Sequence, residues 1–472
     1  MKIYILNPPY VDDFCRSARW AAKSRGRVQR HPEYLLIAAA VLENAGHEVR
    51  FTDGAAQNLT EENVAAQIKE FLPDMAVFHT TTPSIDNDIY YAALAKKWGA
   101  PLTVMVGPHV TAEPEDTLNR GKGAVDVIAR GEYDFILRDL AEGGDLKDVR
   151  GVSYLIDGEI FHNPAAESPD VNLLPFPAWH HVKPEWYSDA GKRFPFLTLI
   201  SGRGCFGECT FCRDVQVMSG RKMRFRDPAL VVDEMEHGYK LFPQIKEIMF
   251  ETDTFTASGK HIKGVCDEIL KRNLKATWSC NVRVDIKPEL LGLMKRAGCR
   301  MLMVGYEFGT QEALDAVKKG TTLEQAREFT TNAHELGFTI HGCFMIGAPG
   351  ETQQSARATI DFAKSLPLDT IQVSGICVYP GTEMYEWAKR EGYLIPKDWR
   401  KWVDENYEQV TLLDYPQMSK REIDEAIDTG LKEFYLRPGQ MFSMLKNIKS
   451  IDDVKRKLYG LKSFVDYFSP KR

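Results

Sequence analysis

The sequence has no long hydrophobic run and no excess of basic residues. The longest apolar stretch, Tyr34–Leu42, is far shorter than the roughly 20 residues that a membrane-spanning helix needs. Lysine and arginine total 60 and aspartate and glutamate total 66, so the net charge is −6. An overall positive field, typical of nucleic-acid-binding proteins, is therefore lacking. Repeats and low-complexity segments are absent as well. Because the apolar runs are short and the net charge is negative, we expect neither a membrane-spanning protein nor a nucleic-acid partner.

A signal peptide is also lacking. Met1–Tyr10 contains a single lysine followed by prolines, without the apolar stretch and cleavage site of a secretory leader. We therefore expect a cytoplasmic protein whose thiols are reduced. In that compartment clustered cysteines indicate a metal site or catalysis more often than disulfides. The composition, with 44% hydrophobic and 27% charged residues among 472, is typical of a globular protein of about two to four domains.

Residues 1–145 alternate short β-rich runs with helical stretches. This alternation predicts an α/β domain with a parallel sheet and helices on both faces, a doubly wound, Rossmann-like domain. Ligands of such domains bind at the carboxyl ends of the strands. The expected strands are Lys2–Asn7, Glu48–Thr52, Met75–His79, Leu102–Val106 and Val125–Ala129, and the expected helices are Glu33–Ala45, Glu61–Phe71, Ile85–Trp98 and Glu113–Asn119.

Residues 146–193 are expected to form a hairpin around Asp157-Gly158 and then a proline-rich linker. The alternation resumes over residues 194–392 and predicts a partial or full β/α barrel of the TIM type, with its chemistry at the carboxyl ends of the strands. Residues 393–472 are expected to form a mostly helical cap. The strands expected in the barrel are Phe196–Ser201, Glu247–Glu251, Ala276–Cys280, Met301–Tyr306, Thr339–Met345 and Thr370–Ile376.

Three of the nine cysteines, Cys205, Cys209 and Cys212, form a CxxxCxxC motif directly after the first expected barrel strand. Three thiolates on a short loop suit a soft metal or an iron–sulfur cluster. Zinc is the alternative, but a closed structural zinc site needs a fourth ligand, and the next cysteine or histidine is His237. Three thiolates therefore indicate a cluster with one iron left open for a substrate or cofactor.

The motif, with the aromatic Phe211 before its last cysteine, resembles the radical S-adenosylmethionine (radical SAM) superfamily. The resemblance implies that Cys205, Cys209 and Cys212 hold a 4Fe-4S cluster whose open iron binds S-adenosylmethionine. An electron from the cluster then cleaves the carbon–sulfur bond of the sulfonium. The resulting 5′-deoxyadenosyl radical abstracts hydrogen from the substrate. Such a radical requires a dry cavity.

Four further motifs resemble the superfamily and fall at the ends of successive expected strands. They are the acidic segment 250–256, Arg283, the Gly-x-Glu element 305–309 and the Gly/Pro turn 347–352. Thr252 and Phe308 depart from the usual residues of these motifs. Segment 318–322 also resembles a family element, or is simply a helix end followed by an N-cap. The residues that the resemblance implies for S-adenosylmethionine are Phe211, Glu251, Asp253, Arg283, Glu307, Gly347 and Pro349.

The amino-terminal domain resembles that of the cobalamin-binding radical SAM group. The matching stretches include Asn7-Pro8-Pro9, residues 44–49, 107–110 and 129–132, and the tail residues 434–438. The chain lacks the Asp-x-His-x-x-Gly motif that supplies an axial histidine in other cobalamin proteins, so we expect cobalamin bound without it. The alternative is a domain that has lost the corrin. The residues expected to bind cobalamin are Thr80, Thr81, Thr82, Gly107, His109, Gly131 and Glu132.

The resemblance implies an enzyme that abstracts hydrogen from an unactivated carbon and transfers a methyl group from methylcobalamin, which a second S-adenosylmethionine restores. One alternative is a radical cyclase or rearrangement enzyme of tetrapyrrole, lipid or natural-product biosynthesis without methyl transfer. Another is a non-catalytic iron–sulfur electron-transfer module. The implied partners are a small-molecule, lipid or tetrapyrrole-like substrate and a flavodoxin- or ferredoxin-type reductant.

A basic segment follows the first expected strand. Its positive charges suit an anionic substrate or the nucleotide phosphate of the corrin, although a solvated charged surface is equally consistent with them. The segment contains Arg16, Arg19, Lys23, Arg25, Arg27 and Arg30.

Overall fold

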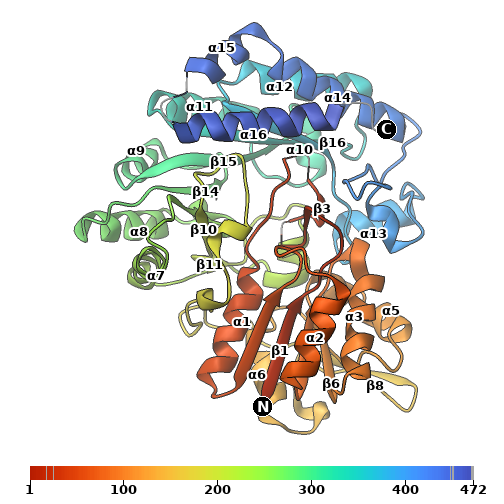
Figure 1. The fold of residues 1–472 in the computed structure, drawn as a ribbon. Coiled ribbons are helices and arrows are strands. Elements are labelled where there is room, and N and C mark those ends of the chain that lie inside the picture. The colour runs from red at the N-terminus through yellow and green to blue at the C-terminus, as the bar shows by residue number, and fades with distance from the viewer. Residues whose placement is uncertain (18, 25, 447, 449–450, 469–472) are drawn as a thin grey trace. The chain divides into compact units, whose positions relative to one another are not determined.

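The structure is a computed structural model that describes residues 1–17, 19–24, 26–446, 448 and 451–468 (Figure 1). The chain divides into two compact units. The first unit comprises Met1–Asp189, Arg213–Gly220 and Pro396–Gln409, and the second comprises Ala190–Cys212, Arg221–Ile395 and Val410–Arg472. The chain thus passes between the units several times, once directly after the last cysteine of the CxxxCxxC motif.

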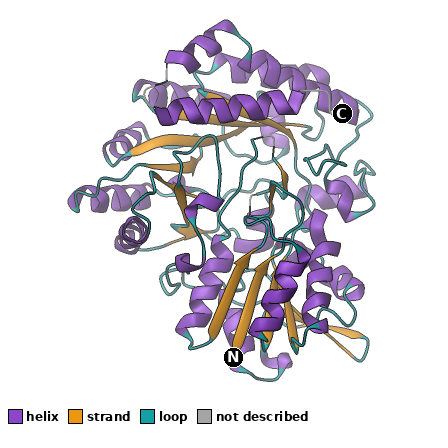
Figure 2. Ribbon diagram, in the orientation of Figure 1, coloured by secondary structure: helices purple, strands orange, loops and turns teal. Residues whose placement is uncertain are grey.

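The first unit is built on a seven-stranded sheet with the order β4-β1-β5-β6-β7-β8-β9. The first five of these strands are parallel, and β8 and β9 form the expected antiparallel hairpin. Helices cover both faces of the sheet (Figure 2), so the predicted doubly wound domain is confirmed. The strands are β1 (Lys2–Asn7), β4 (Glu48–Asp53), β5 (Met75–His79), β6 (Leu102–Val106), β7 (Val127–Ala129), β8 (Val152–Ile156) and β9 (Glu159–His162), with a small pair β2 (Phe14–Cys15) and β3 (Ala22–Lys23).

The helices of this unit follow from local signals. Helix α2 (Glu61–Phe71) begins with a capping box in which Thr60 and Asn63 bind each other's backbone amides. The apolar run noted in the sequence is the buried part of α1 (Glu33–Asn44). The five-residue helix α4 (Pro108–Ala112) was not expected, since it is too short to show a helical repeat. The other helices are α3 (Ile85–Lys97), α5 (Pro114–Arg120) and α6 (Asp134–Glu142).

The crevice where the strand order reverses, between β1 and β5, is filled by the chain itself. Arg16 and Asp88, both with fully buried side chains, form an ion pair of 2.8 Å there. The guanidinium of Arg16 also donates to Asn7 Oδ1 at the end of β1 and to the carbonyl of His79 at the end of β5. The expectation that Arg16 offers its charge to an anionic ligand is therefore wrong, because Asp88 neutralises that charge inside the domain.

Other members of the basic segment are also paired within this unit. Arg27 lies 3.4 Å from Glu408, and Arg30 lies 2.6 Å from Asp189. Arg25 lies outside the described residues. Arg16, Arg27 and Arg30 thus have structural roles in the first unit.

Replacing Arg16 with methionine is expected to lower the free energy of unfolding by about 3–5 kcal/mol, because Asp88 is left buried without its counterion. The matched control is Arg50→Met, which breaks the exposed ion pair between Arg50 and Glu70 and should cost less than about 1 kcal/mol. Urea denaturation of the two variants measures the difference. Equal losses would contradict a stabilising role for the buried pair.

The second unit contains a six-stranded parallel sheet with the order β10-β13-β14-β15-β16-β17. Among the described residues the two outer strands, β10 and β17, do not pair, so the sheet is a partial barrel, the smaller of the two expected forms. The strands are β10 (Phe196–Leu199), β13 (Glu247–Phe250), β14 (Trp278–Val282), β15 (Cys299–Glu307), β16 (Thr339–Ile346) and β17 (Thr370–Gly375).

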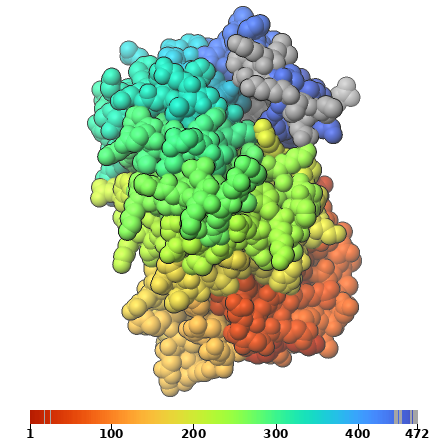
Figure 3. Space-filling view, turned by 90° about the vertical axis from the view of Figure 1, so that its left-hand side faces the viewer, coloured from red at the N-terminus to blue at the C-terminus, as the bar shows by residue number. Residues whose placement is uncertain are grey.

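Helices cover the outside of this sheet. Those that pack beside β10 to β15 form much of the green surface in Figure 3. A short antiparallel pair, β11 (Gly202–Arg203) and β12 (Arg224–Phe225), was not expected. The helices are α7 (Pro228–Leu241), α8 (Gly259–Lys271), α9 (Pro288–Arg296), α10 (Gln311–Ala316), α11 (Leu323–Glu335), α12 (Gln353–Ser365) and α13 (Glu383–Arg390).

The carboxyl-terminal residues are mostly helical, as expected. Helix α14 (Lys420–Tyr435) packs on β17 and α12, and the hydroxyl of Tyr435 bonds both backbone groups of Ile371. Helices α15 (Pro438–Lys446) and α16 (Ile451–Phe468) follow. The segment Pro396–Gln409, which comes before α14 in the chain, belongs to the first unit. No helix within the described part of the chain is long and apolar enough to cross a membrane.

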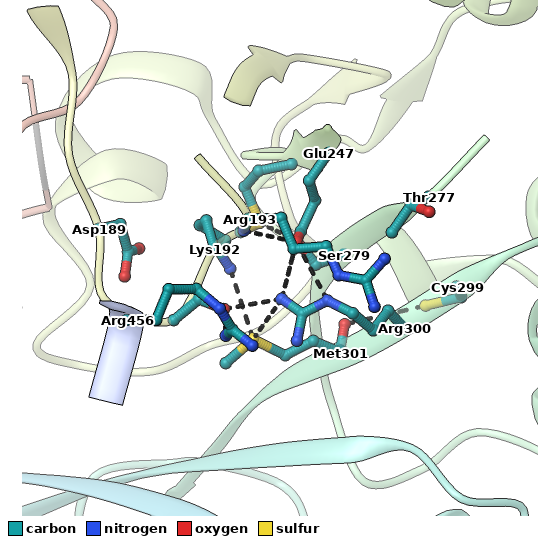
Figure 4. Close-up of polar contacts among 12 residues, drawn as sticks. Asp189, Lys192, Arg193, Glu247, Thr277, Ser279, Cys299, Arg300, Met301 and Arg456 are labelled. Carbon is teal, nitrogen blue, oxygen red and sulfur yellow. Dashed lines mark hydrogen bonds and ion pairs between the residues drawn. The ribbon is translucent and has the colours of Figure 1, made fainter. Parts of the chain in front are cut away.

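The amino ends of the barrel strands are joined by a polar cluster around Glu247 (Figure 4). The buried carboxylate of Glu247 accepts three hydrogen bonds from the guanidinium of Arg300, one from the amide of Arg193 and one from the hydroxyl of Ser279. Lys192, which is also buried, lies 2.9 Å from the sulfur of Met303. This end of the barrel is opposite the carboxyl ends where the sequence motifs lie, so the cluster is a structural one.

Candidate functional site

The three cysteines of the motif lie on the loop after β11, in the second unit. None of the three takes part in a disulfide, and Cys205 and Cys209 are buried. The two sulfurs flank Gly207, since a methyl group added there would lie 3.4 Å from Cys205 Sγ and 3.9 Å from Cys209 Sγ. The thiols of Cys205 and Cys209 therefore approach one point, and the guanidinium of Arg283 approaches it too, since Arg283 Nη1 would lie 3.5 Å from the same methyl group.

The loop is fixed by neighbouring elements of the same unit. Thr210 binds Val317 through its amide and Met384 through its carbonyl. Before the first cysteine, the amide of Gly204 donates to Asp253 Oδ2 at 3.0 Å. The hydroxyl of Thr254 lies 3.5 Å from Cys205 Sγ. A converging set of soft thiol donors on a fixed loop fits an iron–sulfur cluster.

A buried ion pair lies beside the cysteine loop. Lys319 Nζ is 2.7 Å from Glu307 Oε1, and both side chains are buried or nearly so. Burial lowers the pKa of Lys319, but the carboxylate of Glu307 and the thiol of Cys209 outweigh it, so the pKa is raised. Burial in turn raises the pKa of Cys209, and the charge of Lys319 opposes that shift. A cationic Lys319 thus favours the thiolate form that a metal requires.

Glu307 is held in a strained conformation at the end of β15. Its φ of +67° is uncommon for a residue with a side chain, and the pairing of β15 with β16 is irregular between Gly305 and Glu307. A side chain at Gly305 would collide with Glu307 Oε1 and lie 3.0 Å from Lys319 Nζ. Strain of this kind is typical of residues placed for function. Lys319 lies in a segment singled out from the sequence, but its partner was not predicted.

Arg283 lies beside the same loop, and the structure gives its donors partners within the protein. Its guanidinium binds Asp285 at 3.1 Å and the carbonyls of Lys319 and Gly320 at 3.3 and 3.4 Å. It also lies over the ring of Phe206, 5.4 Å from the centroid. These contacts make Arg283 a support of the cysteine loop, and its contact with S-adenosylmethionine stays a prediction.

The other residues predicted for S-adenosylmethionine lie at the strand ends of this unit. Glu251 and Phe211 are half-buried, and Thr252 is fully buried with its hydroxyl bound to the amide of Ser201. Asp253 accepts a hydrogen bond from the amide of Gly204. Their roles toward the cofactor stay predictions.

The Gly/Pro turn after β16 is organised by a buried carboxylate. Glu351 Oε2 accepts hydrogen bonds from the amides of Gly347 and Ala348, and Tyr415 donates to the carbonyl of Gly347. Gly347 has a φ of +106°, a conformation that suits glycine. Pro349 is half-buried. The sequence singled out this turn but not Glu351 as the residue that shapes it.

The stability of this turn is expected to depend on pH. Burial raises the pKa of Glu351 from 4.5 to about 7, although the two amides oppose the shift. The folded protein therefore holds a proton that the unfolded chain releases, so stability is greatest below pH 4.5 and falls as the pH rises through 7. Glu351→Gln should flatten this slope in urea titrations between about pH 5 and about pH 8, whereas the exposed Glu324→Gln should leave it unchanged. A slope unaltered by Glu351→Gln would contradict the assignment.

The carboxyl ends of β5 and β6 in the first unit carry the residues predicted for cobalamin. The three threonine hydroxyls are buried and bonded within the chain: Thr80 donates to the carbonyl of Val106, Thr81 bonds Ser84, and Thr82 lies 3.2 Å from His109 Nδ1. Gly107 has a φ of +113°, and a side chain there would approach the carbonyl of Thr80.

His109 is the most distinctive of these residues. It is buried, its ring packs edge-on against Trp399 at 5.1 Å, and burial lowers its pKa to about 3, so the imidazole is neutral. His109 Nε2 has no hydrogen-bond partner. His79 Nδ1, at the end of β5, is likewise buried without one. Unpartnered buried nitrogens at the ligand-binding edge of the sheet fit a group with polar substituents such as the corrin.

Gly131 and Glu132 follow β7 at the same edge. The amide of Gly131 donates to Thr111 Oγ1 at 3.0 Å, and Glu132 is buried. Met218, from the segment after the cysteines, contacts Thr111 through its sulfur. The predicted cobalamin residues therefore gather at one edge of the first unit, next to a segment whose placement there the sequence did not reveal.

Family models match the two parts of the chain in which these residues lie. Residues 199–363 match the model of the radical SAM superfamily, and residues 27–140 match that of the B12 binding domain. The chain is 31% identical over 404 residues to an uncharacterised methyltransferase of Pyrococcus horikoshii, covering 83% of this chain and 85% of that protein. It is 27% identical over 375 residues to the anaerobic magnesium-protoporphyrin IX monomethyl ester cyclase of Rubrivivax gelatinosus, covering 75% of this chain and 66% of that protein.

A solved structure shows the same fold. It is that of the radical S-adenosylmethionine methyltransferase TsrM from Kitasatospora setae, with a TM-score of 0.73 at 15% identity, covering 99% of this chain and all of that one. The fold and the cysteine loop define a radical SAM enzyme with a B12 binding domain before the barrel. The chain belongs to the radical SAM superfamily, in the group that contains the Pyrococcus methyltransferase.

Proposed function

We propose that this protein is a cobalamin-dependent radical SAM methyltransferase that abstracts hydrogen from an unactivated carbon and adds a methyl group there. The observation that carries the proposal is the presence in one chain of a loop with converging cysteine thiols and a B12 binding domain. The methyltransferase relative, which shares most of its length with this chain, supports methyl transfer over other radical chemistry.

Cys205, Cys209 and Cys212 would hold the cluster, and the strand-end residues of the first unit, with His109 among them, would hold cobalamin. When bound, the cluster supplies the electron that cleaves S-adenosylmethionine, and cobalamin supplies the methyl group. Lys319 keeps positive charge beside Cys209 and fixes the carboxylate of Glu307. That carboxylate can accept hydrogen bonds from an ammonium or a ribose, the polar groups of S-adenosylmethionine.

The turn at Gly347 would provide a second contact with S-adenosylmethionine. Glu351 and Tyr415 fix its backbone, and the glycine allows an adenosine to approach closely.

A second candidate function is radical cyclisation or rearrangement without methyl transfer. The similarity to the magnesium-protoporphyrin ester cyclase favours it. In either case we propose a small-molecule substrate, tetrapyrrole-like or lipid-like, and a cytoplasmic reductant of the flavodoxin or ferredoxin type.

The two candidates differ in a partial reaction that needs no substrate. The anaerobically reconstituted protein, loaded with hydroxocobalamin, is incubated with reductant and S-adenosylmethionine that carries a labelled methyl group. A methyltransferase moves the label from the sulfonium to the corrin and releases an equal amount of S-adenosylhomocysteine. Protein prepared without corrin is the control. Formation of 5′-deoxyadenosine without S-adenosylhomocysteine would favour the cyclase.

A further inference from the structure

Two adjacent histidines and a glutamate converge on the first unit, away from the strand ends that carry the predicted cobalamin residues. His180 Nε2 and His181 Nε2 lie 3.0 and 2.8 Å from the same oxygen, Glu43 Oε1. The three donor atoms all lie within 4.8 Å of one another. Glu43 is in the last turn of α1, and the histidines are in the 3₁₀ turn Trp179–His181.

The turn that carries the histidines is held firmly on α1. The segment Val171–His181, which we call the strap, belongs to the stretch that the sequence predicted to be a linker. Val171 and Leu174 of the strap pack against Ile37 and Val41 of α1. The amide of Ala178 donates to the carbonyl of Leu36 at 3.0 Å. The donor atoms are therefore brought together by packing that does not depend on the histidines.

The burial of the strap adds to this rigidity. Trp179, directly before the histidines, is almost fully buried, and the ring of His181 lies 6.0 Å from that of Phe51 on β4. His180 is more exposed, with 57% of its side chain accessible, whereas only 17% of the His181 side chain is. The site is thus open on one side, where a metal ion and a water molecule can enter.

The donor set and its spacing suit a transition metal. Imidazole nitrogen and carboxylate oxygen are ligands of Zn²⁺, Co²⁺ or Ni²⁺, whereas Ca²⁺ and Mg²⁺ prefer oxygen alone. Tetrahedral bonds of about 2.0–2.1 Å place neighbouring ligand atoms about 3.3 Å apart. The two separations between histidine nitrogen and Glu43 oxygen, 2.8 and 3.0 Å, need to widen by only a few tenths of an ångström, and the two imidazole nitrogens lie within 4.8 Å of each other.

We propose that Glu43, His180 and His181 bind a divalent transition metal ion, Zn²⁺ or one of similar preference, which fastens the strap to α1. Three protein ligands leave one position for water. The site is separate from the cysteine loop, and the proposal does not depend on the methyltransferase function. In the absence of metal the histidines donate to Glu43, which keeps the ligands together.

Competition with a chromophoric chelator tests the proposal on the full-length protein with its cluster assembled, so that the cysteines are occupied. Wild type is expected to bind one equivalent of Zn²⁺, and Glu43→Gln and His181→Gln should each weaken binding at least tenfold. The matched control is His162→Gln, since His162 lies 3.3 Å from Glu115 without a second imidazole and should not affect binding. Equal affinity in wild type and in the His180→Gln/His181→Gln double variant would overturn the proposal.

A second measurement needs no variant. Zinc-edge X-ray absorption of the same protein should show nitrogen and oxygen ligands at about 2.0–2.1 Å with the outer-shell scattering of imidazole. A shell dominated by sulfur at about 2.3 Å would place the zinc on cysteines and refute the site. Chelation should also lower the thermal unfolding midpoint of wild type but not that of the double histidine variant.

Discussion

Cys209→Ala is expected to abolish the reductive cleavage of S-adenosylmethionine, with a fall of at least about 1,000-fold in the formation of 5′-deoxyadenosine. The reason is that three thiolates are the minimum that leaves one iron open and the other three held by the protein. Cys209 is buried, lies beside Gly207 opposite Cys205, and interacts electrostatically with Lys319. Iron content and 5′-deoxyadenosine, measured after anaerobic reconstitution, report the two consequences separately.

The matched control is Cys266→Ala, which removes another buried thiol, from α8, outside the motif. It should leave both the iron content and the cleavage rate near those of wild type. If Cys209→Ala retained full cleavage activity, the cysteine loop would not be the cluster site. If both variants lost activity together with folding, measured by circular dichroism, the effect would be one of stability instead.

Glu307→Gln is expected to have the second-largest effect on the cleavage of S-adenosylmethionine. It leaves the ammonium of Lys319 buried without its counterion, which should cost about 3–5 kcal/mol of folding stability. It also removes the carboxylate that we propose for S-adenosylmethionine, and cleavage should fall at least about 100-fold. Urea denaturation and the rate of 5′-deoxyadenosine formation measure the two effects.

The double variant Glu307→Gln/Lys319→Met separates these roles. Removing both charges eliminates the uncompensated ammonium, so much of the stability should return. The cleavage activity should not return, because the carboxylate is still absent. Recovery of cleavage along with stability would show that Glu307 acts only by supporting the loop.

Local sequence patterns predicted most of the fold. Strands such as Lys2–Asn7 and Met75–His79 have the expected bounds because central parallel strands are continuous apolar runs. Helix α2 was also predicted with its observed bounds, and the structure shows Thr60 capping its start. The order of the two domains and the cysteine motif were likewise predicted, because both depend on residues close together in the chain.

The features that were missed depend on contacts between distant residues. Arg16 and Asp88 are 72 positions apart, and nothing in the basic segment marks Arg16 as the arginine that pairs with a buried aspartate. The strap is rich in proline and was predicted to be a linker, whereas Val171 and Leu174 pack on α1. Similarly, the convergence of Glu43 with His181 joins positions 138 apart.

In the candidate site too, residues within a motif could be predicted from the sequence, whereas their contacts with distant residues could not. The cysteines were predicted from their spacing, and Glu307 from the resemblance of its segment to a family motif at a strand end. The partners that hold them, Lys319 for Glu307 and Thr254 for Cys205, belong to other strand-end loops. Which side chain of a loop faces its neighbour is decided by the packing of the barrel, so spacing alone does not reveal it.

The cofactor content of the purified protein tests the central claim most directly. The protein is reconstituted anaerobically with iron, sulfide and hydroxocobalamin and then desalted, and its iron, sulfide and corrin spectrum are measured. We predict about four irons and four sulfides together with one retained corrin per chain. Four irons without corrin would contradict methyl transfer from cobalamin and leave the first unit without its proposed cofactor.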